Sequence, residues 1–145
     1  MRLIEVTDDS GNIIELNWLI SAEVVHRQLR NMLPPDYVAR MREIFANGAK
    51  MSVTVSDDKV VGVAIWRLIE NTYEGLRLYV DDLVTDEKER SKGIGNLLLQ
   101  HLESKARVLG CNVLTLDSGV QRIAAHKFYF REGMHIPSFC FRKSL

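Results

Sequence analysis

The sequence has few cysteines and no long apolar run, and each shortage excludes a class of protein. Only 2 of its 145 residues are cysteine, which is too few for a disulfide framework or a Cys/His metal cluster. No apolar run approaches the ~20 residues that cross a bilayer, and Glu5 stands where a signal peptide would be apolar. We therefore expect a cytoplasmic protein that binds no metal and no membrane. Cys111 and Cys140 are expected to be small buried hydrophobic residues.

The sequence also lacks net charge, because 19 basic residues balance 19 acidic ones. A neutral chain has no overall basic surface for nucleic acid, so we expect no nucleic-acid partner. The hydrophobic content of 46% and the charged content of 26% are ordinary for a globular chain. Its length suits one domain with a substantial core, so we expect a single domain over residues 1–145.

Apolar spacing and turn residues predict an α/β chain, or more broadly an α+β chain. The expected strands cover residues 3–6, 51–55, 60–66, 76–84, 112–116 and 136–143, and the expected helices cover 12–30, 36–46, 94–109 and 121–131. The resulting order is β-α-α-β-β-β-α-β-α-β. It predicts a mixed central sheet that is flanked by helices on both faces.

The stretch from Leu83 to Gly95 organises this pattern, because a strand, a polar glycine loop and a helix follow one another there. Free backbone N–H groups at a helix N-terminus form a natural cradle for phosphate. Gly93 and Gly95 let an anion approach the main chain, and Arg90 and Lys92 add positive charge. The loop lacks the ending of a nucleotide P-loop and the third glycine of a dinucleotide fingerprint. A plain strand–turn–helix corner is the alternative.

The pattern Arg90-x-x-Gly93-x-Gly95 resembles the acyl-CoA pyrophosphate loop of the GNAT family, the Gcn5-related N-acetyltransferases. The segment 125–129, Ala-His-Lys-Phe-Tyr, with Gly133 after it, resembles the late helix of that family. The two motifs occur in the right order with one strand between them. The resemblance implies a GNAT fold and an acetyl-CoA-dependent N-acetyltransferase.

The resemblance also implies where acetyl-CoA would bind. The expected cofactor-binding residues are Leu83, Val84, Thr85, Arg90, Ser91, Lys92, Gly93, Ile94, Gly95, Asn96 and Arg122. An amide near Leu83 would stabilise the oxyanion of the thioester carbonyl. Ser91 replaces a common glycine, which we expect to be tolerated because the amide does the binding. Arg122 replaces an asparagine that usually touches the pantetheine arm, and a contact with the CoA phosphates is the alternative for this side chain.

An alkyl ammonium has a pKa near ~10 and must lose a proton before it attacks. The resemblance favours Asp81 as the general base, with Asp82 binding substrate or fixing the loop. Consecutive strand residues point to opposite faces, so at most one of the two carboxylates is expected in a given cleft. Asp82 as a purely structural carboxylate is the alternative.

Tyr129 matches the position of the tyrosine general acid in many family members. A tyrosine that is packed in the core is the alternative. His126, three residues earlier on the same helix, is a candidate substrate-binding residue, an alternative base or a surface histidine. A water chain is a third possibility for the base. We expect His26 and His101 to face solvent.

The sequence therefore predicts acetyl transfer to a primary amine by direct attack in a ternary complex. The expected acceptor is a small cationic amine or a protein amine, and the family resemblance suggests a homodimer. The alternative from another class is a non-catalytic acyl-CoA-binding regulatory module that keeps the cradle.

Overall fold

The computed structural model describes all 145 residues, and they form two compact units, Met1–Thr115 and Leu116–Leu145. A single domain over residues 1–145 stays a prediction. The strands are β1 (Arg2–Glu5), β2 (Lys50–Ser56), β3 (Lys59–Asn71), β4 (Gly75–Thr85) and β5 (Val113–Leu116). The helices are α1 (Leu16–Leu29), α2 (Tyr37–Ala46), α3 (Ile94–Val108) and α4 (Ile123–Arg131), with a short 3-10 helix η1 (Glu87–Glu89).

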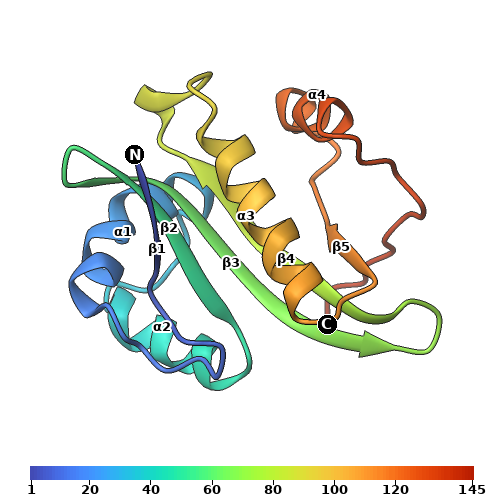
Figure 1. The fold of residues 1–145 in the computed structure, drawn as a ribbon, viewed down its shortest axis with the longest axis horizontal. Helices are drawn as coiled ribbons and strands as arrows, with labels where there is room; N and C mark the ends of the chain where they lie inside the picture. Colours follow the sequence, from blue (N-terminus) through green and yellow to red (C-terminus); the bar gives the residue numbers. More distant parts are fainter. The chain divides into compact units, whose positions relative to one another are not determined.

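The five strands form one sheet in the order β1-β2-β3-β4-β5 (Figure 1). The first four strands pair antiparallel with their neighbours. Helix α3 connects β4 to β5, which is the crossover that a parallel neighbour requires. The predicted mixed sheet is therefore confirmed. None of the helices combines the length and apolarity that a bilayer crossing requires.

The final strand that was expected over residues 136–143 is wrong. Those residues form neither helix nor strand, and Phe139 and Phe141 are exposed. Pro137 has no N–H to donate to a ladder. Cys140 lies in this exposed segment. Cys111 lies just after the end of α3 and is only half-buried. The expectation of two buried cysteines is therefore also wrong.

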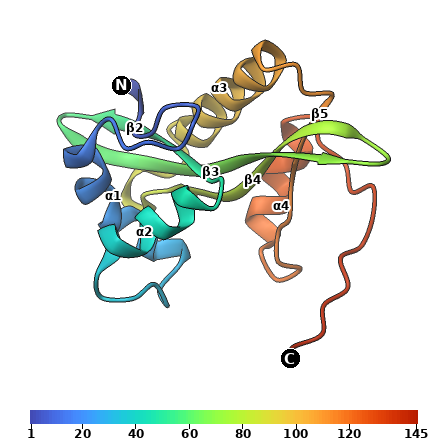
Figure 2. The ribbon, with the colours of Figure 1, turned by 90° about the horizontal axis from the view of Figure 1, so that it is seen from below.

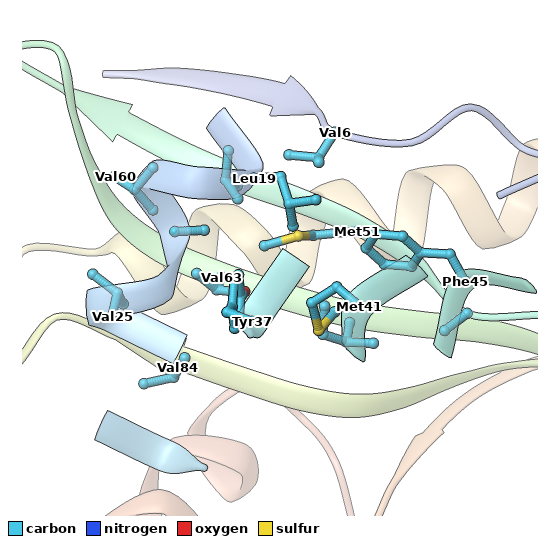
Figure 3. Packing of buried hydrophobic residues seen from close by; sticks show 14 of the residues in the cluster. Val6, Leu19, Val25, Tyr37, Met41, Phe45, Met51, Val60, Val63 and Val84 are labelled. Atoms are coloured by element: carbon cyan, nitrogen blue, oxygen red, sulfur yellow. The ribbon is translucent and has the colours of Figure 1, made fainter. Parts of the chain in front are cut away.

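Within Met1–Thr115, α1 and α2 cover one face of the sheet and α3 covers the other (Figure 2). The main core fills the space between the sheet and the first two helices. Leu19 of α1, Met41 and Phe45 of α2, and Met51 and Val63 of the sheet are buried together there (Figure 3). Burial of each such side chain contributes roughly 1.5–3 kcal/mol, so this layer fixes how α1 and α2 lie on β3 and β4.

Helix α3 approaches the opposite face of the sheet closely because residue 62 of β3 is glycine. A Cβ on Gly62 would lie 2.7 Å from Ile94 Cγ2 and 2.9 Å from Leu98 Cδ1. Both are side chains of the first turns of α3, and both are buried. A glycine at such a strand position allows close packing by a neighbouring element. Gly62 therefore sets the position of the α3 N-terminus, where the glycine loop ends.

Candidate active site

The loop between η1 and α3 has the backbone geometry of an anion cradle. Gly93 precedes α3 with φ +81°, and no side chain caps the helix N-terminus. Ser91 also has a positive φ, +63°. A Cβ on Gly93 would meet no atom within 4 Å, so the space beside this residue is open. Because the first amides of a helix have no intrahelical partner, this open mouth suits a phosphate group.

The charged side chains of this loop are not equivalent. Lys92 Nζ lies 2.7 Å from Glu89 Oε2, so a carboxylate of the same loop already pairs with this cation. Arg90 is exposed and has no ion-pair partner. The side chain of Ile94 is buried in the core. This residue can therefore contact a cofactor only through its backbone amide. Arg90 is thus the side chain that best fits a phosphate here.

At its C-terminal end, β4 has backbone amides that make no hydrogen bonds to β3. Gly62 stands opposite Thr85, and Asp86 N donates to Val61 O at 2.9 Å, so Val61 and Asp86 continue the ladder by one hydrogen-bonded pair. Hydrogen-bonded pairs alternate with non-bonded pairs in an antiparallel ladder. The amides of Leu83 and Thr85 therefore point away from β3.

The next strand, β5, does not reach this part of β4. Asn112 N, just before β5, donates to Leu76 O at 2.8 Å, and β5 has only four residues. Running parallel from that point, β5 ends short of Leu83. The amides of Leu83 and Thr85 therefore lie beyond the paired part of the two strands, where an extended ligand arm can pair with them.

A β-bulge in β4 changes where its two carboxylates point. Asp82 stands opposite Ile65 and Val80 stands opposite Trp66, so Asp81 has no partner on β3. An extra residue of this kind re-aims side chains next to it. Both carboxylates consequently line the same cleft, on the face covered by α1 and α2. The expectation that at most one would do so fails, because strand alternation stops at the bulge.

The cleft has a volume of about 910 Å³, and its walls come from the end of α1, the loop after it, α2 and the middle of β3 and β4. Apolar side chains such as Leu29, Met32 and Ile44 form part of the lining. The ionisable groups around it are His26, Arg30, Arg40, Arg67, Glu43, Asp81 and Asp82. Three arginines thus balance three carboxylates, and the cleft presents both signs of charge.

Asp81 makes an ion pair that uses one of its two carboxylate oxygens. Oδ2 accepts from Arg67 Nε at 2.8 Å and from Arg67 Nη2 at 2.6 Å. The side chain is 25% exposed. Neither bond uses Oδ1, so this oxygen is left to accept from a ligand in the cleft.

Asp82 is engaged at both oxygens and is only 12% exposed. Oδ2 lies 2.7 Å from His26 Nε2, and Oδ1 accepts from Arg30 Nε at 2.6 Å. Burial raises the pKa of the Asp82 carboxyl, but hydrogen bonds and electrostatic attraction from His26 and Arg30 outweigh it and hold that pKa below its ordinary value. Asp82 is therefore ionised at neutral pH, and both of its oxygens already accept hydrogen bonds from side chains of α1 and the residue after it. A role for Asp82 in binding substrate stays a prediction.

His26 is 1% exposed, so the expectation that it faces solvent is wrong. Leu19 and Ala22, which are buried on α1, precede it at helical spacing, and this stripe was the sequence signal for its burial. His26 Nδ1 lies 2.8 Å from the hydroxyl of Tyr37 on α2. His101 is half-buried, with Nε2 2.6 Å from Glu5 Oε1, so it does not face solvent freely either.

The remaining predicted site residues belong to the unit Leu116–Leu145. Tyr129 of α4 is half-buried, and burial raises the pKa of its hydroxyl although a hydrogen bond and the charge of Arg122 oppose that rise. His126 Nε2 lies 2.8 Å from the carbonyl oxygen of Gly119, so this ring nitrogen is held within its own unit. The roles assigned to Tyr129, Arg122 and His126 stay predictions.

The positive φ of Ser91 leads to a stability prediction. A non-glycine residue in the left-handed region costs about 1–2 kcal/mol, whereas glycine there costs only chain entropy of about 0.5–1 kcal/mol. Ser91→Gly should therefore raise the free energy of unfolding by about 0.5–1 kcal/mol, measured by urea denaturation. Ser91→Ala removes the hydroxyl but keeps the strain, and should change it by less than about 0.5 kcal/mol. Equal stability of the two variants would contradict the assignment of strain.

Among curated proteins, the chain matches parts of two N-acetyltransferases. It is 43% identical over 72 residues to an uncharacterized N-acetyltransferase, YhdJ, of Bacillus subtilis, which covers 49% of this chain and 51% of that protein. It is 36% identical over 66 residues to the aminoalkylphosphonate N-acetyltransferase of Salmonella typhimurium, covering 46% and 43% of the two chains. The chain thus spans about half the length of these curated relatives.

Solved structures share the fold over the whole chain at low identity. A ribosomal-protein-alanine N-acetyltransferase from Brucella melitensis superimposes with a TM-score of 0.82 at 16% identity, covering 100% of both chains. An aminoglycoside acetyltransferase from a soil metagenomic sample, in complex with sisomicin, gives 0.80 at 17% identity, covering 99% and 95%. The model of the acetyltransferase (GNAT) family matches residues 17–134. That range includes both the glycine loop and the whole late-helix motif, and the chain belongs to the GNAT family of acetyltransferases.

Proposed function

We propose that this chain is an acetyl-CoA-dependent N-acetyltransferase, which acetylates a primary amine by direct attack in a ternary complex. One observation carries the proposal: the end of β4 combines a carboxylate with amides that point away from β3. Asp81 has an oxygen left for a ligand in the cleft, and the amide of Leu83 follows two residues later. A proton acceptor and an oxyanion donor are the two groups that aminolysis of a thioester needs most.

The cofactor side uses the glycine loop and the end of β4. Acetyl-CoA supplies the acetyl group as an activated thioester. Amides of residues 91–96 and the side chain of Arg90 would hold its phosphates, and the amide of Thr85 would pair with the extended arm. The N–H of Leu83 would donate to the carbonyl oxygen as negative charge develops on it. A preorganised donor of this kind contributes about 10²–10³ in kcat.

On the acceptor side, Asp81 Oδ1 would take the proton from the incoming ammonium group. Arg67 holds the other oxygen and fixes the carboxylate in place. Tyr129 would donate a proton to the departing thiolate. Burial raises the pKa of this hydroxyl, so the phenol holds its proton at neutral pH but is a weaker acid than a free tyrosine. The support for this role is therefore the match of Tyr129 to the late-helix motif of the family.

We further propose that the acceptor carries an anionic group as well as its amine. Every carboxylate around the cleft is matched by an arginine, so the cleft is not the strongly acidic site that a polycation would favour. An arginine guanidinium binds carboxylate and phosphonate groups well. The named substrate class of the Salmonella typhimurium relative, the aminoalkylphosphonates, has this combination of charges. A cytoplasmic location and a homodimer also remain proposals.

The experiment that tests this function is a calorimetric titration with acetyl-CoA, followed by an assay of CoA thiol release with a panel of amines. The panel contains an aminoalkylphosphonate, an α-amino acid, a polyamine, an aminoglycoside and a peptide with a free N-terminus. We expect binding, and turnover that is fastest with an amine bearing an anionic group. Binding without turnover on any amine would favour the acyl-CoA-binding regulatory module, and fastest turnover with the polyamine would refute the proposed acceptor class.

A further inference from the structure

We propose that His26 is a positioning residue for the acetyl transfer, acting through Asp82 and Arg30 on the bulge that presents Asp81. The inference rests on the proposed function, in which Asp81 accepts the proton of the amine. His26 itself touches neither the cofactor loop nor Asp81 in the structure. Its effect on the reaction would pass through a chain of hydrogen bonds that starts in the core and ends at the bulge.

The buried part of this chain joins α1, α2 and β4. The ring of His26 lies between the Tyr37 hydroxyl, 2.8 Å from Nδ1, and the Asp82 carboxylate, 2.7 Å from Nε2. Both Tyr37 and His26 are almost completely buried. Since an ionised carboxylate only accepts hydrogen bonds, Nε2 carries the proton that it donates to Asp82. The imidazole is thus held at both nitrogens, which fixes its orientation.

The outer part of the chain joins Asp82 to the bulge. Arg30 Nε donates to Asp82 Oδ1 at 2.6 Å, and Arg30 Nη2 donates to the backbone carbonyl of Asp81 at 3.0 Å. That carbonyl belongs to the residue that has no partner on β3. One guanidinium therefore ties the peptide of the bulge to a carboxylate whose other oxygen is fixed by His26. If Asp82 shifts, Arg30 loses its anchor and the bulge loses this support.

Stability alone does not account for a histidine at position 26. The residue follows the buried stripe of Leu19 and Ala22 on α1, where an apolar side chain would pack well. Replacing a buried polar pair by apolar residues is often neutral or stabilising, because burying charged groups is costly. The polar chain instead orients Asp82, Arg30 and the bulge, and the geometry of the cleft wall depends on that orientation.

Two amide variants separate the hydrogen bond to Asp82 from the hydrogen bond to Tyr37. His26→Gln places an amide N–H near the position of Nε2 and keeps the donor to Asp82. His26→Asn places its amide near the position of Nδ1, so it reaches Tyr37 but not Asp82. Both variants remove the imidazole and leave a neutral amide in the same buried place, and the asparagine side chain is one methylene shorter than that of glutamine.

We expect His26→Asn to lower kcat for the best amine of the panel by at least 10-fold, with the KM for acetyl-CoA changed by less than 2-fold. His26→Gln should restore most of the rate, to within about 3-fold of the original protein. In two-dimensional amide NMR spectra, the resonances of residues 80–83 should move in His26→Asn and stay near their original positions in His26→Gln. Equal kcat values and equal spectra for the two variants would overturn the inference.

The NMR measurement also keeps this inference distinct from the proposed function. If the original protein acetylates no amine, the proposed function fails. The spectra then decide the structural part alone: movement confined to His26→Asn supports the coupling of His26 to the bulge, and its absence overturns it.

Discussion

Replacing Asp81 by asparagine should lower kcat for acetyl transfer by about 100-fold or more. Asparagine has nearly the same shape and can still accept hydrogen bonds from Arg67, but its amide cannot take a proton from an ammonium group. General base catalysis contributes about 10²–10⁴ to a rate, which sets the size of the loss. Steady-state kinetics with the best amine of the panel measures it, and the affinity for acetyl-CoA should stay within about 3-fold.

Asp58→Asn is the matched control for this variant. Asp58 lies in the turn between β2 and β3, its side chain is 93% exposed, and it lies outside the cleft. The same chemical change there should leave kcat within about 2-fold. If Asp81→Asn kept more than a third of the original kcat, the base would have to be a water chain or His126 instead.

The second large effect is expected from Gly93→Glu, which should weaken acetyl-CoA binding by at least 100-fold. The open space beside Gly93 would admit the new side chain, so its carboxylate could enter the mouth formed by the α3 amides. There it would compete with the phosphates for the same N–H groups and repel them. Calorimetric titration with acetyl-CoA measures the loss directly.

Gly110→Glu controls for backbone strain in this experiment. Gly110 has φ +79°, almost the value of +81° at Gly93, and a Cβ there would also meet no atom within 4 Å. It follows the other end of the same helix, far from the cradle in sequence. Both variants should lose similar stability in urea denaturation, and only Gly93→Glu should lose the cofactor. Unchanged affinity in Gly93→Glu would refute the placement of the phosphates at this loop.

Local sequence signals predicted the strand, loop and helix of the proposed cofactor side, because this geometry depends on the backbone. A strand, a glycine loop and a helix in succession are enough to bring free amides to one place. The structure adds one feature that sequence did not predict, the positive φ of Ser91. This backbone conformation explains why glycine suits that position.

The acceptor side was harder to predict, because its geometry depends on contacts between residues far apart in the chain. From the sequence, Asp81 and Asp82 were expected to alternate as consecutive strand residues do. No local sequence signal marks the bulge that directs both side chains into the same cleft. Likewise, the partner of His26 lies 56 residues away on β4. The segment 136–143 shows the converse error, since alternation predicted a strand where the structure has no ladder.

The bulge at Asp81 has a consequence for how such a site can evolve. Val80 and Asp82 stand opposite Trp66 and Ile65, which are themselves consecutive, so the ladder on each side is continuous apart from the one extra residue. A deletion of the Asp81 codon would therefore leave every other strand pair in its present register and remove only this carboxylate. A single in-frame insertion in an ancestor with an unbroken ladder would have the opposite effect. The proposed proton acceptor can thus be gained or lost in one genetic step that leaves the pairing of the other strand residues in register.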